Sequence, residues 1–492
     1  MNTKYIYWLG LLLYSTAVLY IGWRGFRRTK TSPKPDTEFW NAGRSLSGWS
    51  AGISISASFM SISWSCVYTV QLYYWYGLGA LWLVPIPWLL TMAGYYFFTS
   101  HFRKLPAFSQ PEMVANRFGQ RARTFLALPL AFVFLVWGGA EIFAAAHVLS
   151  PLLELPFHLV LAFIAVVVAS YSLMGGFSAV VITDRIQFAL VAFFITAIAW
   201  ISGSVILSET SISNWLTDLP SPPKVNSSAL AFLAPGLPLI FLTLIAYLPG
   251  WLVESDIWLR LQASKNDNAA RKAVVISFAN SLLFLALLPM IIGFAALYLY
   301  PPEGTIIPAN LNDGASIFSV FMQNHAPVWL SVILSIGLAA AAMSTIDTCG
   351  NVVALSLSYD LVEPILMKRK AIINQTTISR WMSAGAVGLA YLYALFTDSL
   401  WDMFYLSSGI LTTTIFIPML AVFSKSAKKS SVEASAATGF IATILFYFLE
   451  SRGYLAAFEP QALANTELGY ILWGLLAAGV GYWVGQRRGE RD

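Results

Sequence analysis

Residues 45–65 read SLSGWSAGISISASFMSISWS, a stretch that is apolar enough to cross a membrane yet carries nine serines. A second irregular stretch follows five apolar spans later, at residues 232–253, where three prolines and a glycine interrupt the pattern (Pro235, Pro238, Pro249 and Gly250). Taken singly, either stretch fits serines that bond back to the carbonyl four residues earlier, or small residues that aid packing. As a pair in corresponding places of two halves, they favour a binding site at the middle of the membrane. Unwound backbone there leaves carbonyls that need a partner such as a cation.

The rest of the chain is typical of a polytopic membrane protein. Of its 492 residues, 58% are apolar and 11% are charged, and the mean hydropathy is +0.67. Soluble globular chains carry about 25% charged residues, so a soluble enzyme, a disordered chain and a nucleic-acid-binding protein are excluded. Apolar runs of about 20 residues recur. We expect an all-α protein with about thirteen transmembrane helices, near residues 5–24, 46–72, 78–99, 124–149, 156–174, 180–206, 232–253, 273–300, 327–356, 377–397, 399–424, 432–450 and 468–486.

The basic residues predict the orientation in the membrane. Of the 29 Lys and Arg residues, all but Lys4, Lys224 and Arg452 fall on one side of the predicted spans. Because cytoplasmic loops are enriched in Lys and Arg, we expect an outside N-terminus, with an uncleaved first helix, and a cytoplasmic C-terminus. The cell membrane, as in a bacterial inner membrane, is the expected location. The loops 100–123 and 254–272 are expected at the membrane surface, and the aromatic residues 73–76 in the interfacial belt.

A few polar side chains stand out within the spans, where a charge costs about 2.5–3.5 kcal/mol near the bilayer centre on insertion scales. The charged ones are Glu141, Asp184 and Asp347. Beside Asp347, three hydroxyl groups lie on less than two turns of one predicted helix, those of Ser344, Thr345 and Thr348. Such oxygen ligands suit a hard monovalent cation such as sodium. The alternative is that the hydroxyls pack between helices and that Asp347 pairs with a basic neighbour.

At these residues the chain resembles the sodium/solute symporter family, and the resemblance extends over essentially its whole length. Five motifs carry it in order. They are Gly43-Arg44-Ser45-Leu46, Ala57-Ser58-Phe59-Met60-Ser61, Gly175-Gly176 with Thr183-Asp184 and Gln187, Ala269-Ala270-Arg271 after Lys265, and Ala341-Ala342-Met343-Ser344-Thr345.

The resemblance implies a LeuT-like fold of two inverted five-helix repeats. They would cover residues 45–206 and 232–424, preceded by an extra N-terminal helix in residues 1–30. Two C-terminal helices and a short cytoplasmic tail would occupy residues 430–492. The whole chain would form a single membrane transport domain, residues 1–492, acting as a monomer.

The resemblance also implies a sodium site between the first and eighth core helices. Its ligands would be the carbonyls of Ala57, Met60 and Ala341 and the hydroxyls of Ser344 and Thr345. Some members bind a second sodium ion through an aspartate that corresponds to Asp184. Family members often have hydroxyl residues at the positions of Asp347 and Thr348, so Asp347 is a point of variation. Together with Asp184 it completes a second sodium site or holds a proton, because two nearby carboxylates raise one pKa. One or two sodium ions are therefore expected.

The solute is expected to be small and organic, such as an amino acid, a carboxylate or a sugar. By resemblance, Phe59, Ser61, Trp64, Tyr68 and Tyr247 would line its pocket, with Tyr247 as an inner gate. Aromatic side chains there suit a ring or a cation. Sugar carriers have an acidic-amide pair where this chain has Ser63-Trp64, and proline carriers have an aspartate at the position of Phe59. These departures speak against a sugar and leave proline open.

The favoured function is sodium-driven symport of that solute into the cell. The alternative on the same fold is proton-coupled symport that uses Asp347 or Asp184. A membrane enzyme or a sensor module is a remote alternative, since the sequence shows no acid/base or metal constellation and no signalling segment. The two cysteines, Cys66 and Cys349, lie in apolar runs and are expected to be buried, without a disulfide.

Overall fold

The computed structural model describes residues 3–31, 42–105, 107–368, 375–397 and 399–488. These residues form helices with short 3-10 and π segments and contain no β-strand. The principal helices include α1 (Thr3–Thr31), α5 (Pro85–Arg103), α7 (Gln120–Leu153), α8 (Phe157–Glu209), α15 (Val328–Ala354), α17 (Gln375–Ala394), α20 (Lys429–Ser451) and α22 (Gly469–Arg488). An all-helical membrane protein is therefore confirmed.

The exact number of spans is not settled by helix length. Within the described residues, seven helices are long and apolar enough to cross a membrane, or eight if one bent pair counts as a span. The two predicted spans at 156–174 and 180–206 both fall within α8, of which Thr183–Glu209 has the length and hydropathy of a span. The count of thirteen remains a prediction.

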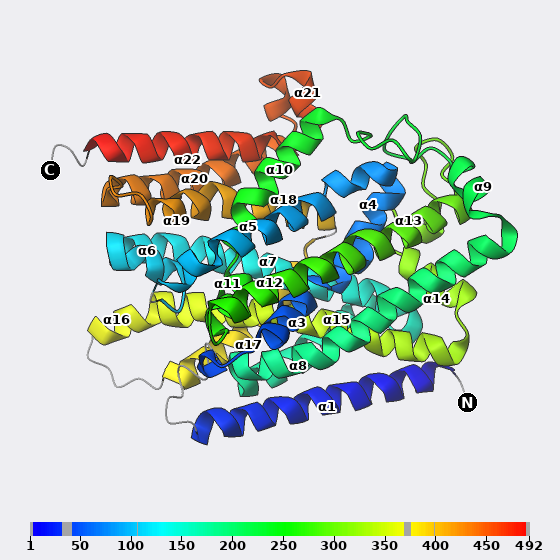
Figure 1. The fold of residues 1–492 in the computed structure, drawn as a ribbon, viewed down its shortest axis with the longest axis horizontal. Coiled ribbons are helices and arrows are strands. Elements are labelled where there is room, and N and C mark those ends of the chain that lie inside the picture. The colour runs from blue at the N-terminus through cyan, green and yellow to red at the C-terminus, as the bar shows by residue number, and fades with distance from the viewer. Residues whose placement is uncertain (1–2, 32–41, 106, 369–374, 398, 489–492) are drawn as a thin grey trace.

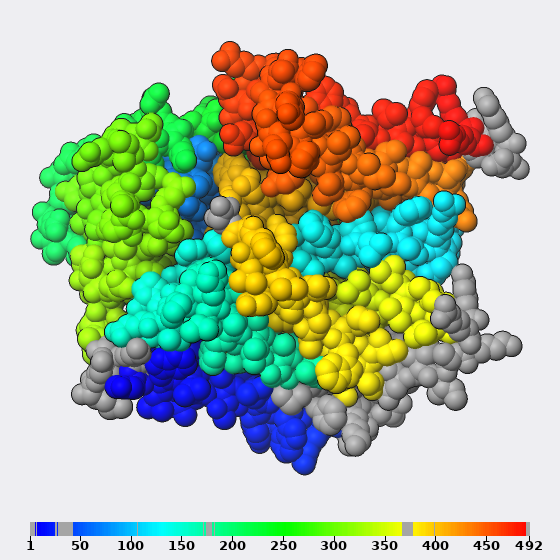
Figure 2. Space-filling model, turned by 180° about the vertical axis from the view of Figure 1, so that it is seen from behind, coloured from blue at the N-terminus to red at the C-terminus, as the bar shows by residue number. Residues whose placement is uncertain are grey.

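The helices differ in how deeply they lie inside the bundle. Figure 1 shows α1 along one edge and the paired helices α20 and α22 along the opposite edge, and Figure 2 shows the same two edges from behind. The most apolar part of the segment Val328–Leu366, which begins with α15, is 72% buried, against 28% for α20. Since α15 packs on α3, α7, α8 and α17, it is the central wall against which a site forms.

The serine-rich stretch is a broken helix, as its composition predicts. α3 (Gly48–Phe59) ends at Met60, and the chain resumes as the π segment η2 (Ile62–Tyr68) and α4 (Thr69–Tyr76). The two parts meet at an angle of 58°. Ser47 and Ser61 cap the starts of the two parts, and the Ser61 hydroxyl accepts a hydrogen bond from the amide of Trp64 at 3.0 Å. Serine is a favoured N-cap because its hydroxyl satisfies an otherwise unpaired amide.

The second interrupted stretch is also broken, and a neighbouring helix repairs its backbone. α10 (Leu237–Trp251) contains Pro249, and after Leu252–Glu254 the chain continues as α11 (Ser255–Ala263). The hydroxyl of Thr412, in the π segment η7 (Leu411–Phe416), accepts from the Gly250 amide at 2.9 Å and donates to the Ala246 carbonyl at 2.8 Å. Added bulk at Gly250 would meet Leu411 and Thr412 within 3.0 Å, so this close approach requires glycine.

Two expectations about surface position are wrong. The loop 254–272 does not simply lie on the membrane surface, because every residue of α11 within it is buried. Tyr73 and Tyr74 are fully buried rather than placed in a lipid-facing belt. The loop 100–123 forms a short helix, α6 (Gln110–Phe118), whose apolar face is buried. The basic residues of this loop predicted a solvated segment. In the structure α11 is buried and packs against the broken helix α3.

Further segments complete the second half of the chain. They are α12 (Asp267–Ser281), η4 (Leu282–Leu287), α13 (Leu288–Leu299), α18 (Leu400–Ile410) and α19 (Ile417–Ala421). Two connections between helices carry the short helices α9 (Ile212–Thr217) and α14 (Ile317–His325).

Candidate functional site

The break in α3 faces the middle of α15. The Thr345 hydroxyl donates to the carbonyl of Ser58 at 3.0 Å. The last carbonyls of a helix lack intrahelical partners, and Ala57 and Met60 lie at the end of α3, both fully buried. Ala341 precedes Thr345 by one turn on α15 and is also fully buried. The contact between Thr345 and Ser58 thus joins the two helices at which the resemblance implies a sodium ion.

Ser344 reaches a different partner. Its hydroxyl donates to one carboxylate oxygen of Asp184 at 2.9 Å, and Ser54 on α3 donates to the other oxygen. Asp184 and Ser344 are both fully buried. The aspartate on α8 therefore joins α3 and α15 from the side.

A buried arginine occupies the region of the predicted second cation site. The Arg260 guanidinium, on α11, lies 3.2 Å from Asp184 and donates to the Thr348 hydroxyl at 3.0 Å. It also donates to Ser54 at 2.8 Å and pairs with Asp256 at 3.4 Å. A positive charge thus already sits between Asp184 and Thr348. Asp347, fully buried on the same turn as Thr348, is held in the interior.

Sequence reasoning missed Arg260, because it treated this side chain as one of the solvated cytoplasmic charges. The structure places it inside the protein, with no exposed side-chain surface. In the sequence, a single arginine after an apolar span looks the same whether its side chain is solvated or buried. The one available signal is Asp256 four residues earlier, since an i, i+4 pair shares a helix face.

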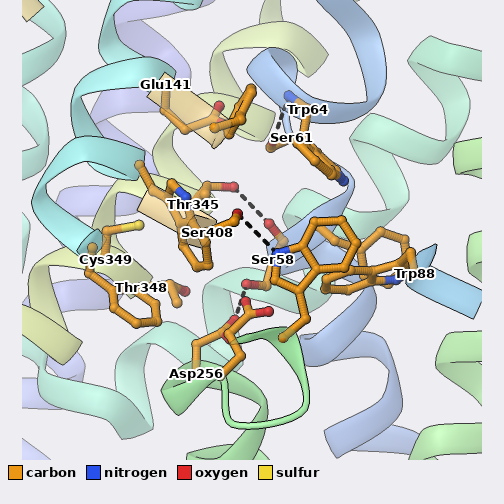
Figure 3. A pocket seen from close by; sticks show the side chains of 16 residues that line it. Ser58, Ser61, Trp64, Trp88, Glu141, Asp256, Thr345, Thr348, Cys349 and Ser408 are labelled. Carbon is orange, nitrogen blue, oxygen red and sulfur yellow. Dashed lines mark hydrogen bonds between the residues drawn. The ribbon is translucent and has the colours of Figure 1, made fainter. Parts of the chain in front are cut away.

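A small cavity, about 60 Å³ in volume, lies beside the break in α3. Figure 3 shows Glu141 and Asp256 at its two ends, with Ser58, Thr345 and Thr348 between them. Aromatic side chains are the largest group in its wall, namely Phe59, Trp64, Trp88, Phe134, Trp137, Trp251 and Phe404. Glu254, Ser61, Cys349 and Ser408 complete the lining. The cavity thus borders the Thr345–Ser58 contact directly.

Three of the five predicted pocket residues line this cavity, namely Phe59, Ser61 and Trp64. Tyr68 and Tyr247 do not border it but stand behind its wall. Tyr68 stacks on Trp64 at 5.4 Å between ring centroids, and Tyr247 stacks on Trp251 at 4.2 Å and on Tyr405 at 4.8 Å. Both tyrosines are fully buried, so they support the wall in this conformation.

The other aromatic side chains of the wall come from distant segments. Trp88 is on α5, Trp137 on α7, Trp251 at the end of α10 and Phe404 on α18. Phe134 is also on α7. Aromatic residues are common throughout the chain, so no local pattern marked these five. Glu141 was recognisable as a carboxylate within a span. Cys66 and Cys349 are free and buried, as expected.

Known proteins resemble this chain over most of its length. The sodium/sialic acid symporter NanT of Aliivibrio fischeri is 24% identical over 89% of this chain and 87% of its own length. The sodium/glucose cotransporter of Vibrio parahaemolyticus is 24% identical over 93% of this chain and 89% of its own length.

The fold has a counterpart among solved structures. A substrate-bound, outward-open structure of a Na⁺-coupled sialic acid symporter superimposes with a TM-score of 0.72, at 18% identity, over 98% of this chain and 97% of the other. A model of the sodium:solute symporter family matches residues 39–439. The chain therefore belongs to the sodium:solute symporter family, and its function is sodium-driven symport across a membrane.

Proposed function

We propose that the chain imports a small organic solute together with one sodium ion, which binds between the break in α3 and α15. The contact between Thr345 and the Ser58 carbonyl carries this assignment. It brings a hydroxyl group to the place where the helix exposes its last carbonyls. The proposed ligands are the carbonyls of Ala57, Met60 and Ala341 and the hydroxyls of Ser344 and Thr345.

The chemistry of this ligand set suits sodium. All five ligands are neutral oxygen atoms, which replace the water around a hard cation without holding it too tightly to leave. Asp184 contacts Ser344 and adds a negative charge beyond the ligands. An ion that joins α3 to α15 would favour the closed arrangement of the two helices, and binding of the solute and the ion would be coupled in this way.

The position of Arg260 supports one sodium ion rather than two. Its guanidinium bridges Asp184 and Thr348, where the second ion was expected. A sodium ion there would face an adjacent positive charge in a medium of low dielectric constant. We therefore propose that Arg260 is the resident cation of this second position, and that the proton alternative through Asp184 loses its main support.

The proposal also covers the membrane orientation, the two halves of the fold and the solute class. The basic residues favour an outside N-terminus and a cytoplasmic C-terminus in the cell membrane. The breaks in α3 and α10 support two related halves, within residues 45–206 and 232–424. The relatives' names give sialic acid and glucose as their solutes. A small organic solute that binds next to the sodium ion, carried by a single chain, is the corresponding proposal here.

The test is thermal unfolding of the purified protein in detergent, in sodium chloride against equal potassium chloride. A ligand that binds only the folded protein stabilises it by RT ln(1 + [L]/Kd), about 2.7 kcal/mol at 100 times the Kd. We expect a sodium-selective rise in the unfolding temperature that Thr345→Ala removes and that Thr345→Ser, which keeps the hydroxyl, retains. Equal unfolding temperatures of the wild-type protein in the two salts would exclude the site.

A further inference from the structure

The ionisable side chains that line the cavity beside the proposed sodium site are acidic. Three carboxylates line it, those of Glu141, Glu254 and Asp256, and no Lys, Arg or His is among its described lining residues. Asp256 pairs with Arg260. Within the described part of the chain, Glu141 and Glu254 have no basic group within ion-pair distance, and one oxygen of Glu254 has no hydrogen-bond partner. A buried carboxylate without a counterion is costly.

Glu141 is the carboxylate best placed to meet a cation in the cavity. It is 1% exposed, and both the hydroxyl and the amide of Ser63 donate to it, the amide at 3.4 Å. These two donors fix the side chain at the end of the cavity next to the break in α3. They carry no full positive charge, so the carboxylate remains available to a cation that enters the cavity.

The walls between the carboxylates are aromatic. Trp64 lies at the centre of them, 4.5 Å from Phe404 and 5.5 Å from Trp251 between ring centroids. Trp88 lies 5.2 Å from Trp251 and 5.3 Å from Phe59. The faces of such rings carry negative potential and attract ammonium groups, and the attraction is strongest where water is excluded.

One polar group of this wall has no hydrogen-bond partner within the described part of the chain. The indole nitrogens of Trp88, Trp137 and Trp251 each donate to a serine hydroxyl. The indole nitrogen of Trp64 is buried and donates to no atom of the described chain. Because a buried donor is costly when unsatisfied, it is suited to an oxygen atom of the solute.

We propose that the solute is a compact organic cation, a primary to quaternary ammonium compound with an oxygen acceptor. Its charge lies among Glu141 and the aromatic rings, and its oxygen accepts from Trp64. This inference rests on the proposed sodium-driven transport and specifies its substrate class. An anionic sugar acid would meet uncompensated carboxylates here, and a neutral sugar would leave most of its hydroxyl groups against aromatic carbon.

The experiment compares cations with an uncharged isostere of one of them and with an anion, at a fixed 100 mM sodium. The probes are choline, tetramethylammonium and ethanolamine as cations, 3,3-dimethyl-1-butanol as the uncharged isostere of choline, and N-acetylneuraminate as an anion. Binding to the purified protein is measured by calorimetry. We expect at least one cation to bind at least tenfold more tightly than the isostere and the anion. If the isostere or the anion binds as tightly as every cation, the proposal is wrong.

A pair of variants locates the charge preference. Glu141→Gln is expected to reduce the ratio of cation to isostere affinity at least tenfold, whereas a merely structural role would weaken both ligands alike. Glu433→Gln, which removes a carboxylate on α20 outside the cavity, is expected to leave the ratio unchanged. Retention of the full ratio in Glu141→Gln would overturn the assignment of Glu141.

Sodium-dependent stabilisation, measured on every variant without any probe, separates this proposal from the previous one. If sodium stabilises the protein but no cation is preferred, the substrate class alone fails. If sodium has no effect, the proposed sodium site fails, whatever the probes show. A sodium response in Glu141→Gln also demonstrates that the variant is folded.

Discussion

Arg260 and Asp184 form a fully buried ion pair, with 3.2 Å between a guanidinium nitrogen and a carboxylate oxygen. The two residues come from α11 and α8, and Ser54 of α3 contacts both. Additional hydrogen bonds of this kind offset part of the cost of moving two charges out of water. The pair therefore connects the broken helix α3 to its supports on two sides.

Removal of one member of this pair should be much more harmful than removal of both. Arg260→Met leaves Asp184 as an unpaired buried charge, which costs about 3–5 kcal/mol. Asp184→Asn in the same chain removes that charge and should restore part of the stability. The measurement is a double-mutant cycle by thermal unfolding in potassium chloride. A double variant no more stable than Arg260→Met would show that the two residues are not coupled.

High sodium should partly rescue Arg260→Met. If the guanidinium is the resident cation beside Thr348, its loss opens a place where sodium can compensate Asp184. The unfolding temperature of this variant should then continue to rise at sodium concentrations that saturate the wild-type protein. Parallel curves for the two proteins would contradict the assigned role of Arg260.

The Thr412 hydroxyl should be indispensable to the backbone of α10. Thr412→Val keeps the shape of the side chain, so its methyl group still separates the Gly250 amide from the Ala246 carbonyl. Each unsatisfied buried group costs about 1–3 kcal/mol, and the unfolding temperature should fall accordingly. Thr412→Ser retains the hydroxyl and serves as the control, and similar losses in both variants would assign the effect to packing instead.

The charge moved per solute should be two, one from sodium and one from the cationic solute. Each charge gains about 2.3 kcal/mol from a membrane potential of 100 mV, so uptake should respond steeply to voltage. Labelled solute, labelled sodium and current are measured together in proteoliposomes. A sodium-to-solute ratio of one with a single charge per solute would indicate a neutral solute.

The orientation can be tested with thiol labelling, because both native cysteines are buried. Tyr5→Cys and Arg488→Cys place new thiols at exposed positions near the two ends of the chain. A membrane-impermeant maleimide should label Tyr5→Cys in intact cells, and Arg488→Cys only after permeabilisation. The reverse pattern would invert the predicted topology.

The sequence was most informative where composition departs from that of a plain helix. The serines predicted the break in α3, and Pro249-Gly250 predicted the break before α11, because both patterns weaken the helical hydrogen-bond ladder. Thr345 and Asp184 were recognisable because hydroxyl and carboxyl groups are expensive in a membrane. The structure places both beside the break.

Contacts between distant segments were not predictable in this way. Arg260 follows an apolar span and has the sequence context of a cytoplasmic charge, yet every residue of α11 is buried. Trp88 and Phe404 reach the same cavity from α5 and α18. Periodicity identifies the buried face of each helix but does not predict which helices pack against one another. The cavity forms where several such faces pack together.

The bridge through Thr412 has a mechanical consequence. Since one hydroxyl completes the backbone of α10 from η7, the two segments cannot separate without stranding polar groups in the interior. The two segments would therefore move as one rigid body when the transporter changes from the outward-open to the inward-open conformation. The flexible joint of the cycle must then lie elsewhere, and the break between Phe59 and Ile62, where the helical ladder of the stretch is interrupted beside the contact of Thr345 with Ser58, is the natural pivot.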